Sequence, residues 1–234
     1  MREVSEPEAL ETVTEAAVAI ETQEDTQAAL EEIVRQAWRC LPEFEHVSLS
    51  RVSSELTLET LAATTDLARE FDGLQSDVRE GPCITASAED EVVAVRHAKH
   101  EQRWPHYIGK AVARGLQSQL GVRLHSDSQG WVCLNLHSTT HEEIEAGSIG
   151  VAEHFAVHAG LALGHMQKSE QLHTAIGSRT LIGTAIGITM ERFGLTQPDA
   201  FAYLVRQASE TNRKVRLIAS DLVEQAECAR QDGT

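Results

Sequence analysis

Apolar residues in the first forty positions recur every three or four residues, which is the spacing of one buried helix face. This pattern predicts an acidic amphipathic helix within residues 1–23 and a second helix over residues 24–40. Pro42 ends the second helix, because proline lacks the N–H that would continue the hydrogen-bond ladder. The apolar positions of the two faces are Leu10, Val13, Ala17, Ile20, Leu30, Ile33, Val34 and Ala37.

From residue 47 the apolar residues alternate with polar ones, as they do along strands with one buried face. Helices at 65–75 and 104–114 interrupt the strands, and Gly81-Pro82 marks a loop. A turn at Asp127–Gly130 joins the last two strands into a hairpin. We therefore expect a mixed α+β domain around an antiparallel sheet. Strands are predicted at 47–51, 56–61, 92–95, 116–125 and 130–137.

The chain is predicted to be helical from about Thr140 to its end. Residues 142–192 contain no proline and form one long helix, which must either connect domains or pair with a partner helix. Thr196 is a suitable N-cap for the next helix, in which Pro198 occupies the first turn. A final helix shows the most regular apolar stripe, from Val215 to Ala226.

Composition narrows the class of protein. Hydrophobic residues make up 41% of the chain, enough for a core, but no run approaches the roughly 18 apolar residues of a membrane span. The acidic N-terminus lacks a signal-peptide pattern, so we expect a cytoplasmic protein. The four cysteines are widely scattered, which favours free thiols.

The formal charge of −16 opposes nucleic-acid binding by the whole surface, yet it permits a local basic site. Between Arg206 and Arg216 there are four cations and one acid. Arg213 is expected opposite the apolar stripe of the last helix, with Lys214 and Arg216 at its flanks. Guanidinium groups suit bidentate phosphate contacts, although a solvated helix surface with charge pairs is the alternative.

Residues 178–225 resemble the ANTAR family of antitermination regulators. The resemblance implies a three-helix fold that binds paired RNA hairpins and prevents terminator formation. The chain departs from the family at Ile186-Gly187, because the family usually has a lysine beside the glycine of the first helix. The matching residues are Ala185, Gly187, Ala200, Phe201, Leu204, Ser209, Asn212, Arg213, Lys214, Arg216 and Ala219. The RNA-binding residues expected here are Arg206, Ser209, Asn212, Arg213, Lys214 and Arg216.

Residues 24–165 resemble the GAF domains that precede ANTAR modules in actinobacteria. The resemblance implies a small-molecule sensor on a five- or six-stranded sheet, with no motif for a cyclic nucleotide, haem or bilin. Cys83 and Trp104 are candidates for ligand or redox sensing, although a cysteine after Gly-Pro is more often a small buried residue. The resemblance is carried by residues 79–83, 103–105, Gly115 and 130–136.

Other candidate chemistry is weak. His154 and His158 share a helix face, but there is no HExxH and no evident third ligand, so no metal and no cofactor are expected. No nucleophile with a base partner indicates an enzyme. The predicted long helix also has a series of small residues, which favours close packing within the bundle or across a dimer. These are Gly177, Ser178, Gly183, Ala185 and Gly187.

We therefore expect three parts: an acidic helix at 1–23, a GAF-like sensor at 24–165 and an ANTAR RNA-binding domain at 166–230. The expected protein is a signal-responsive antitermination regulator, homodimeric through its long helix, which recognises dual hairpin loops and has an unknown small-molecule effector. The alternatives are a small-molecule sensor whose C-terminal helices only dimerise, or a docking adaptor. Exposed apolar residues on the C-terminal helices would favour dimerisation, and Leu217 is the one apolar residue predicted to be exposed there.

Overall fold

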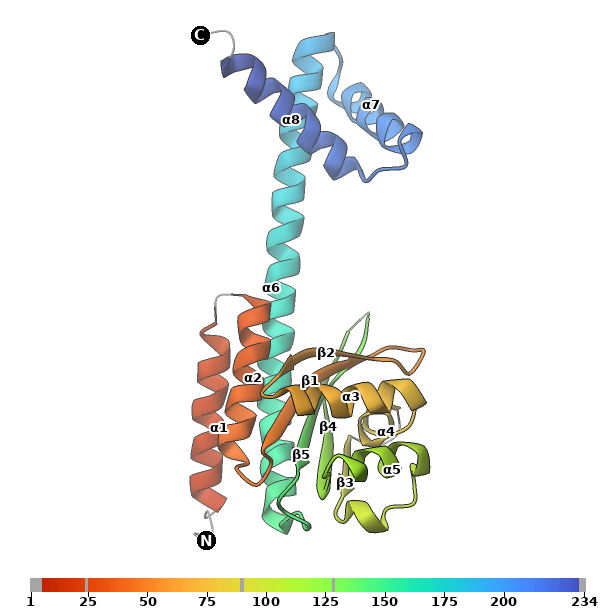
Figure 1. The fold of residues 1–234 in the computed structure, drawn as a ribbon. Coiled ribbons are helices and arrows are strands. Elements are labelled where there is room, and N and C mark those ends of the chain that lie inside the picture. The colour runs from red at the N-terminus through yellow and green to blue at the C-terminus, as the bar shows by residue number, and fades with distance from the viewer. Residues whose placement is uncertain (1–5, 24, 89–90, 128, 232–234) are drawn as a thin grey trace. The chain divides into compact units, whose positions relative to one another are not determined.

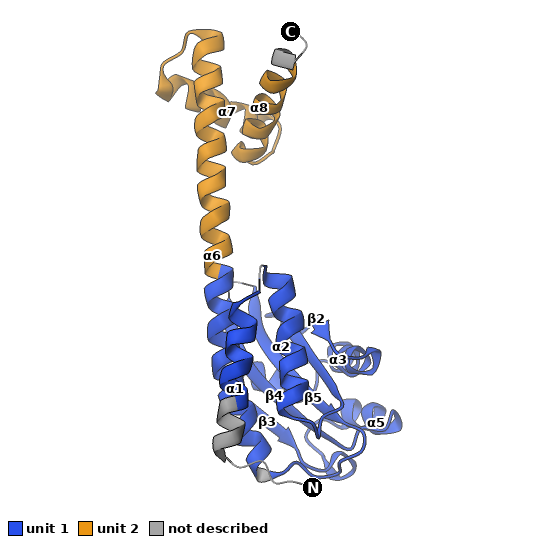
Figure 2. Ribbon diagram, turned by 90° about the vertical axis from the view of Figure 1, so that its left-hand side faces the viewer, with its two compact units in different colours: residues 1–167 blue, residues 168–234 orange. Residues whose placement is uncertain are grey.

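The computed structural model describes residues 6–23, 25–88, 91–127 and 129–231 of the 234-residue chain. The chain divides into two compact units, residues 1–167 and residues 168–234 (Figures 1 and 2). The division lies inside α6 (Ala146–Phe193), a single 48-residue helix. The predicted long helix is confirmed, and within the described residues no helix has the length and apolarity to cross a membrane.

A five-stranded antiparallel sheet organises the first unit, in the order β2-β1-β5-β4-β3 (Figure 1). The predicted hairpin is present, since β4 and β5 pair from Ser118↔Ser138 to Asp127↔Gly130. This confirms the α+β class. The strands are β1 His46–Val52, β2 Leu58–Ala63, β3 Val92–Val95, β4 Ser118–Asp127 and β5 Gly130–Ser138.

Two sets of helices cover the two faces of this sheet (Figures 1 and 2). Helix α2 (Thr26–Cys40) and the first part of α6 pack on an apolar face, and α1 (Glu6–Glu21) packs against α2. Helices α3 (Asp66–Val78), α4 (Pro82–Ala88) and α5 (Pro105–Ala113) pack on the other. The first helix shares the core of the sheet, because Val13, Ala16 and Ile20 are buried in it.

Two local predictions are wrong. Gly81-Pro82 does not form a loop but begins helix α4: proline suits a first helical turn, and Gln75 Oε1 accepts a hydrogen bond from the Cys83 N–H at 2.9 Å. Leu56 is not in a strand, because it lies in a turn with φ 61°, and β2 begins at Leu58. In both places a side-chain hydrogen bond or a tight turn outweighs the hydrophobic pattern.

The second unit consists of the end of α6 with α7 (Gln197–Glu210) and α8 (Val215–Gln231). Thr196 caps α7 as predicted, since its side chain accepts from the Asp199 N–H. The glycines of α6 do not pack closely in this unit, because a Cβ added at Gly177, Gly183 or Gly187 would meet nothing within 4 Å. The buried apolar core is small. It comprises Ala185, Leu204, Ala208, Ile218 and Ala219.

Candidate functional site

The turn between α7 and α8 places the predicted basic residues. Helix α7 ends at Glu210 with Thr211 as its C-cap, and Asn212 follows in the left-handed region at φ 51°, a conformation that asparagine tolerates. The Arg213 N–H then donates to the Ala208 carbonyl at 2.9 Å, and the Lys214 carbonyl accepts from the Leu217 N–H at 2.9 Å. Backbone hydrogen bonds thus fix the turn.

All six predicted RNA-binding residues are exposed and gather at this turn. Two lie near the end of α7, three in the turn and one in the first turn of α8. The first turn of α8 carries no acidic residue, so its free N–H groups add partial positive charge to that of the cations. We call this set the cation cluster; it comprises Arg206, Ser209, Asn212, Arg213, Lys214 and Arg216.

Arg213 has an anionic neighbour. Its Nη1 and Nη2 atoms donate to the Asp221 carboxylate at 2.6 and 3.3 Å, and this hydrogen bonding raises the pKa of Arg213 and lowers that of Asp221. The side chains are 42% and 44% exposed, so the pair is a solvated one rather than a buried one. Exposed ion pairs are weak and screened by salt, so a phosphate can replace Asp221.

The other cations are held loosely. The Arg206 guanidinium lies 5.8 Å from the centre of the Tyr203 ring, within cation–π range. Lys214 and Arg216 have no ion-pair partner within the described part of the chain. These side chains can therefore turn toward a polyanion without first breaking strong contacts.

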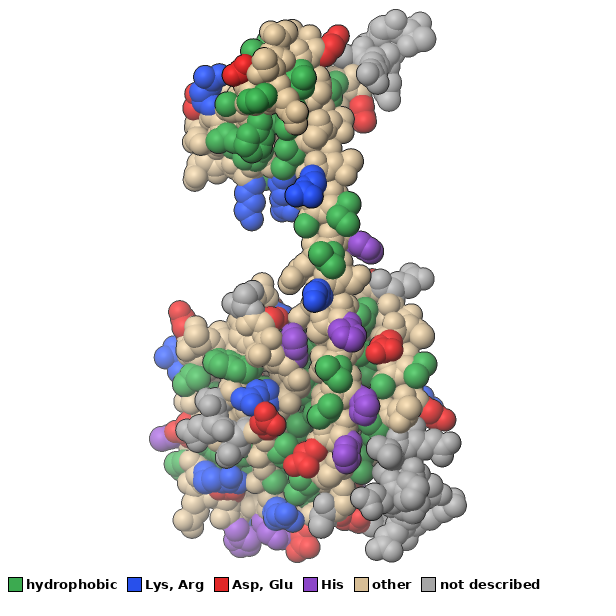
Figure 3. All heavy atoms as spheres, turned by 180° about the vertical axis from the view of Figure 1, so that it is seen from behind, with side chains coloured by type: hydrophobic (Ala, Val, Ile, Leu, Met, Phe, Trp, Pro, Cys, Tyr) green, Lys and Arg blue, Asp and Glu red, His purple; other side chains and the backbone are tan. Residues whose placement is uncertain are grey.

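Charge is divided unequally between the two units. Residues 168–234 contain eight Lys/Arg and eight Asp/Glu, so the whole formal charge of −16 lies on residues 1–167. Figure 3 shows Lys and Arg side chains on the C-terminal unit. The cation cluster is thus a local concentration of positive charge on a formally neutral unit.

The first unit contains a second candidate, a buried polar cluster between the sheet and α3–α5. The Asp72 carboxylate accepts hydrogen bonds from Ser50, from Thr60 at 3.0 Å and from Asn135 at 3.0 Å. Burial raises the pKa of Asp72 to about 6, although these hydrogen bonds oppose the shift. The sequence did not single out Asp72, because its partners lie far away in the chain.

Several polar atoms of this cluster lack a partner among the described residues: Gln75 Nε2, Gln119 Nε2, Asn135 Oδ1 and His137 Nε2. Burial lowers the pKa of His137 to about 3, so its imidazole is neutral. Its Nδ1 lies 3.3 Å from the His46 carbonyl oxygen, which can only accept. His137 Nε2 is therefore an acceptor, and the cluster offers both donors and acceptors to a small polar molecule.

Of the two sensor candidates from the sequence, Cys83 borders this cluster. Cys83 is fully buried, and a hydrogen bond with Cys133 together with burial raises its pKa well above the ordinary value. A thiolate is the reactive form, so this environment opposes redox chemistry at Cys83. Trp104 is 7% exposed, and its Nε1 donates to Thr85 Oγ1 at 3.2 Å.

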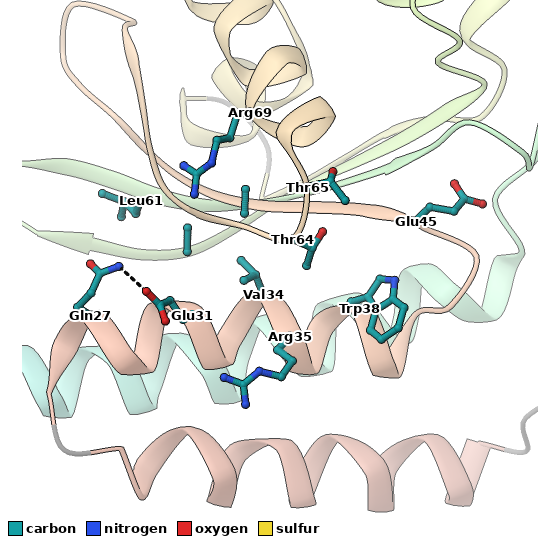
Figure 4. Close-up of a pocket in the computed structure, with 12 residues that line it drawn as sticks. Gln27, Glu31, Val34, Arg35, Trp38, Glu45, Leu61, Thr64, Thr65 and Arg69 are labelled. Atoms are coloured by element: carbon teal, nitrogen blue, oxygen red, sulfur yellow. Dashed lines mark hydrogen bonds between the residues drawn. The ribbon is translucent and has the colours of Figure 1, made fainter.

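A groove of about 530 Å³ lies on the surface between α2 and the end of edge strand β2 (Figure 4). Trp38, which is 48% exposed, and Val34 contribute from α2, and Leu61 from β2. Arg69 lies at the rim of this groove. Sequence reasoning missed the groove, because Trp38 lies beside the apolar stripe of α2 rather than in it.

Residues 170–223 match the ANTAR domain family. The C-terminal unit is an ANTAR domain. ANTAR domains are RNA-binding modules of antitermination regulators, and the three helices predicted from the resemblance are present. No curated protein matches the chain.

Solved structures show the fold of the other unit. The chain is similar to GAF domains of phosphoenolpyruvate-protein phosphotransferases from Acinetobacter (14% identity, TM-score 0.52) and Coxiella burnetii (13%, 0.55). Each match covers 70% of this chain and 96% of the other. A bacteriophytochrome from R. palustris matches at 11% identity and TM-score 0.59, over 76% of this chain but only 42% of its own. The first unit thus has the fold of a GAF domain, and we call it the GAF unit; the ANTAR domain follows it. The chain spans less than half of that bacteriophytochrome.

The ANTAR domain also exposes more apolar surface than predicted. Leu217 is 41% exposed as expected, but it is not alone, because Phe193 (50%), Phe201 (46%) and Val205 (37%) are exposed as well. The bundle is too small to bury every apolar residue of three helices. These side chains are available to a partner.

The GAF unit offers no metal site within its described residues, since no three His, Cys, Asp or Glu side chains gather there. His154 is exposed and His158 half-buried on α6.

Proposed function

We propose that this GAF–ANTAR protein is a signal-responsive antitermination regulator whose cation cluster binds hairpin loops of a transcript. The observation that carries the proposal is the exposed cluster at the turn between α7 and α8, inside the segment that matches the ANTAR family. Phosphates attract the cations, and loop bases are open to hydrogen bonds from Asn212 and Ser209. The bound hairpins would no longer form a terminator.

We further propose that the protein acts as a homodimer through α6. Exposed apolar pairs four residues apart support this: Val157 with Leu161 in the first unit, and Leu172 with Ile176 in the second. Two weak RNA sites on one dimer gain affinity through effective concentration, which fits an RNA with two hairpins. Light scattering on the full chain is expected to give the mass of two chains.

The signal would be a small polar molecule bound by the GAF unit. The unpartnered buried atoms around Asp72 support this location, because buried donors and acceptors gain free energy when a ligand satisfies them. Cys83 and Trp104 would border such a ligand. Binding there would bias the geometry of α6 and hence the RNA affinity of the dimer.

A filter-binding titration with an RNA of two hairpins, repeated at several salt concentrations, tests the RNA site. Arg213→Ala and Arg216→Ala should each weaken binding about tenfold and reduce the salt slope by about one. Arg96→Ala is the matched control, since it removes the same charge from an exposed position of the GAF unit. Unchanged affinity and slope in both cluster variants would sink the assignment.

A further inference from the structure

The exposed aromatic ring of α7 is not explained by packing within the ANTAR domain. Phe201 is 46% exposed, whereas Leu204 and Ala208 of the same helix are buried and belong to the core. An exposed phenylalanine costs solubility and adds nothing to this core. The ring of Phe201 is therefore available to a ligand or partner that would cover it.

The position of Phe201 links it to the cation cluster. Phe201, Val205 and Ser209 are four residues apart, so they follow one another along one side of α7 in steps of about 6 Å. All three are exposed, and the series ends at the turn that carries Asn212 and Arg213. Figure 3 shows hydrophobic side chains of this unit gathered in a patch, with Lys and Arg as well as Asp and Glu side chains near its margins.

We propose that Phe201 is a stacking platform for an unpaired base of the RNA loop whose phosphates the cation cluster holds; this rests on the proposed function. A loop base has a flat apolar face that water solvates poorly, and an aromatic side chain covers such a face without reading its identity. Val205 extends the apolar surface toward the cluster. The cluster supplies charge and hydrogen bonds, and Phe201 supplies the stacking surface that the cluster lacks.

Charge favours RNA over a second copy of the chain as the occupant. In a two-fold contact the same patch meets itself, so Arg206 and Arg213 of one copy would approach those of the other. The net repulsion would oppose such a contact, whereas a polyanion is attracted by the same residues.

The experiment uses the full chain and an RNA with two hairpins, carrying 2-aminopurine at one loop position at a time. Phe201→Ala should weaken binding by roughly 10- to 100-fold, the cost of one lost base stack, with no change in the salt slope because no charge is removed. Phe201→Tyr keeps the ring and should bind within threefold of the unchanged protein. Phe201→Leu keeps apolar bulk without the ring and should behave like the alanine variant.

A fluorescence signature identifies stacking directly. At one loop position, 2-aminopurine emission should fall on binding, and the fall should be lost with Phe201→Ala and kept with Phe201→Tyr. Circular dichroism and light scattering on each variant establish that helix content and mass are unchanged.

Three outcomes would count against the inference. Affinity of Phe201→Ala within twofold of the unchanged protein overturns it while leaving the RNA site intact. A loss of dimer mass in Phe201→Ala overturns it in favour of a contact between copies. If the unchanged protein binds no two-hairpin RNA, the proposed function itself fails, and that result is distinct from the other two.

Discussion

The GAF unit carries all of the net negative charge and keeps its candidate site buried, whereas the ANTAR unit is formally neutral and keeps its candidate site on the surface. Asp72 is 1% exposed amid hydroxyl and amide partners. Arg213 is 42% exposed and faces one carboxylate. A buried polar site suits a small molecule that can be enclosed, and an exposed cationic site suits a polyanion too large to enclose.

Stability is divided in the same way. The GAF unit buries apolar residues on both faces of a five-stranded sheet, while the core of the ANTAR unit consists of only a few buried side chains among its described residues. The smaller core should be easier to break. Three changes would test or sharpen this contrast.

The largest effect is expected from Leu204→Ala. Leu204 is fully buried in the ANTAR core, so its truncation should cost about 2–5 kcal/mol, enough to unfold a unit with so small a core. Hydrogen exchange should show α7 and α8 losing protection while the strands of the GAF unit keep theirs. Leu217→Ala, at an exposed position, should change the free energy of unfolding by no more than about 0.5 kcal/mol. Equal loss of protection in both units would refute the division.

A smaller effect on stability is expected when a glycine of α6 is replaced by alanine, once in each unit. The change should destabilise the GAF unit and stabilise the ANTAR unit. A Cβ at Gly160 would lie 2.2 Å from the Leu124 carbonyl oxygen, so Gly160→Ala should destabilise the GAF unit by about 1–3 kcal/mol. A Cβ at Gly183 would have no neighbouring atom within 4 Å, so Gly183→Ala should stabilise the helix by about 1 kcal/mol. Urea titrations give both values. Destabilisation by Gly183→Ala would indicate a partner helix packed against that glycine.

The smallest of the three effects is a pH dependence confined to the GAF unit. Because the folded pKa of Asp72, about 6, exceeds the unfolded value near 3.8, the folded state holds its proton to higher pH. Stability should therefore fall as pH rises from about 4 through 6 and level off above about pH 7. Asp72→Asn carries no titrating group and should remove this fall, which is about 1–2 kcal/mol between pH 5 and pH 7.5.

Urea unfolding at pH 5 and pH 7.5 measures this difference for both proteins. A pH response that is the same with and without Asp72 would assign it to other groups. Removal of the response by Asp72→Asn, with the ANTAR transition unchanged, would sharpen the contrast between the units.

Hydrophobic periodicity and capping residues were enough to predict much of the architecture. The long α6, the hairpin of β4 and β5 and the helices after Thr196 follow from periodicity and capping, which act between near neighbours in the chain. The cation cluster was predictable for the same reason, because its residues lie within a short segment from Arg206 to Arg216. The start of α4 was missed, because a glutamine from α3 stabilises it.

The sequence by itself therefore determined the two kinds of unit, the antiparallel sheet and the basic segment, since each depends on patterns among residues that are close together along the chain. Only the tertiary structure brought Asp72 to Asn135, which is 63 residues away, and left Asp72 buried among hydroxyl and amide groups. It alone paired Arg213 with Asp221 and left Phe201 uncovered. Whether a side chain is buried, and which side chains it contacts, depends on which surfaces the fold brings together. The hydrophobic periodicity of the chain does not specify this.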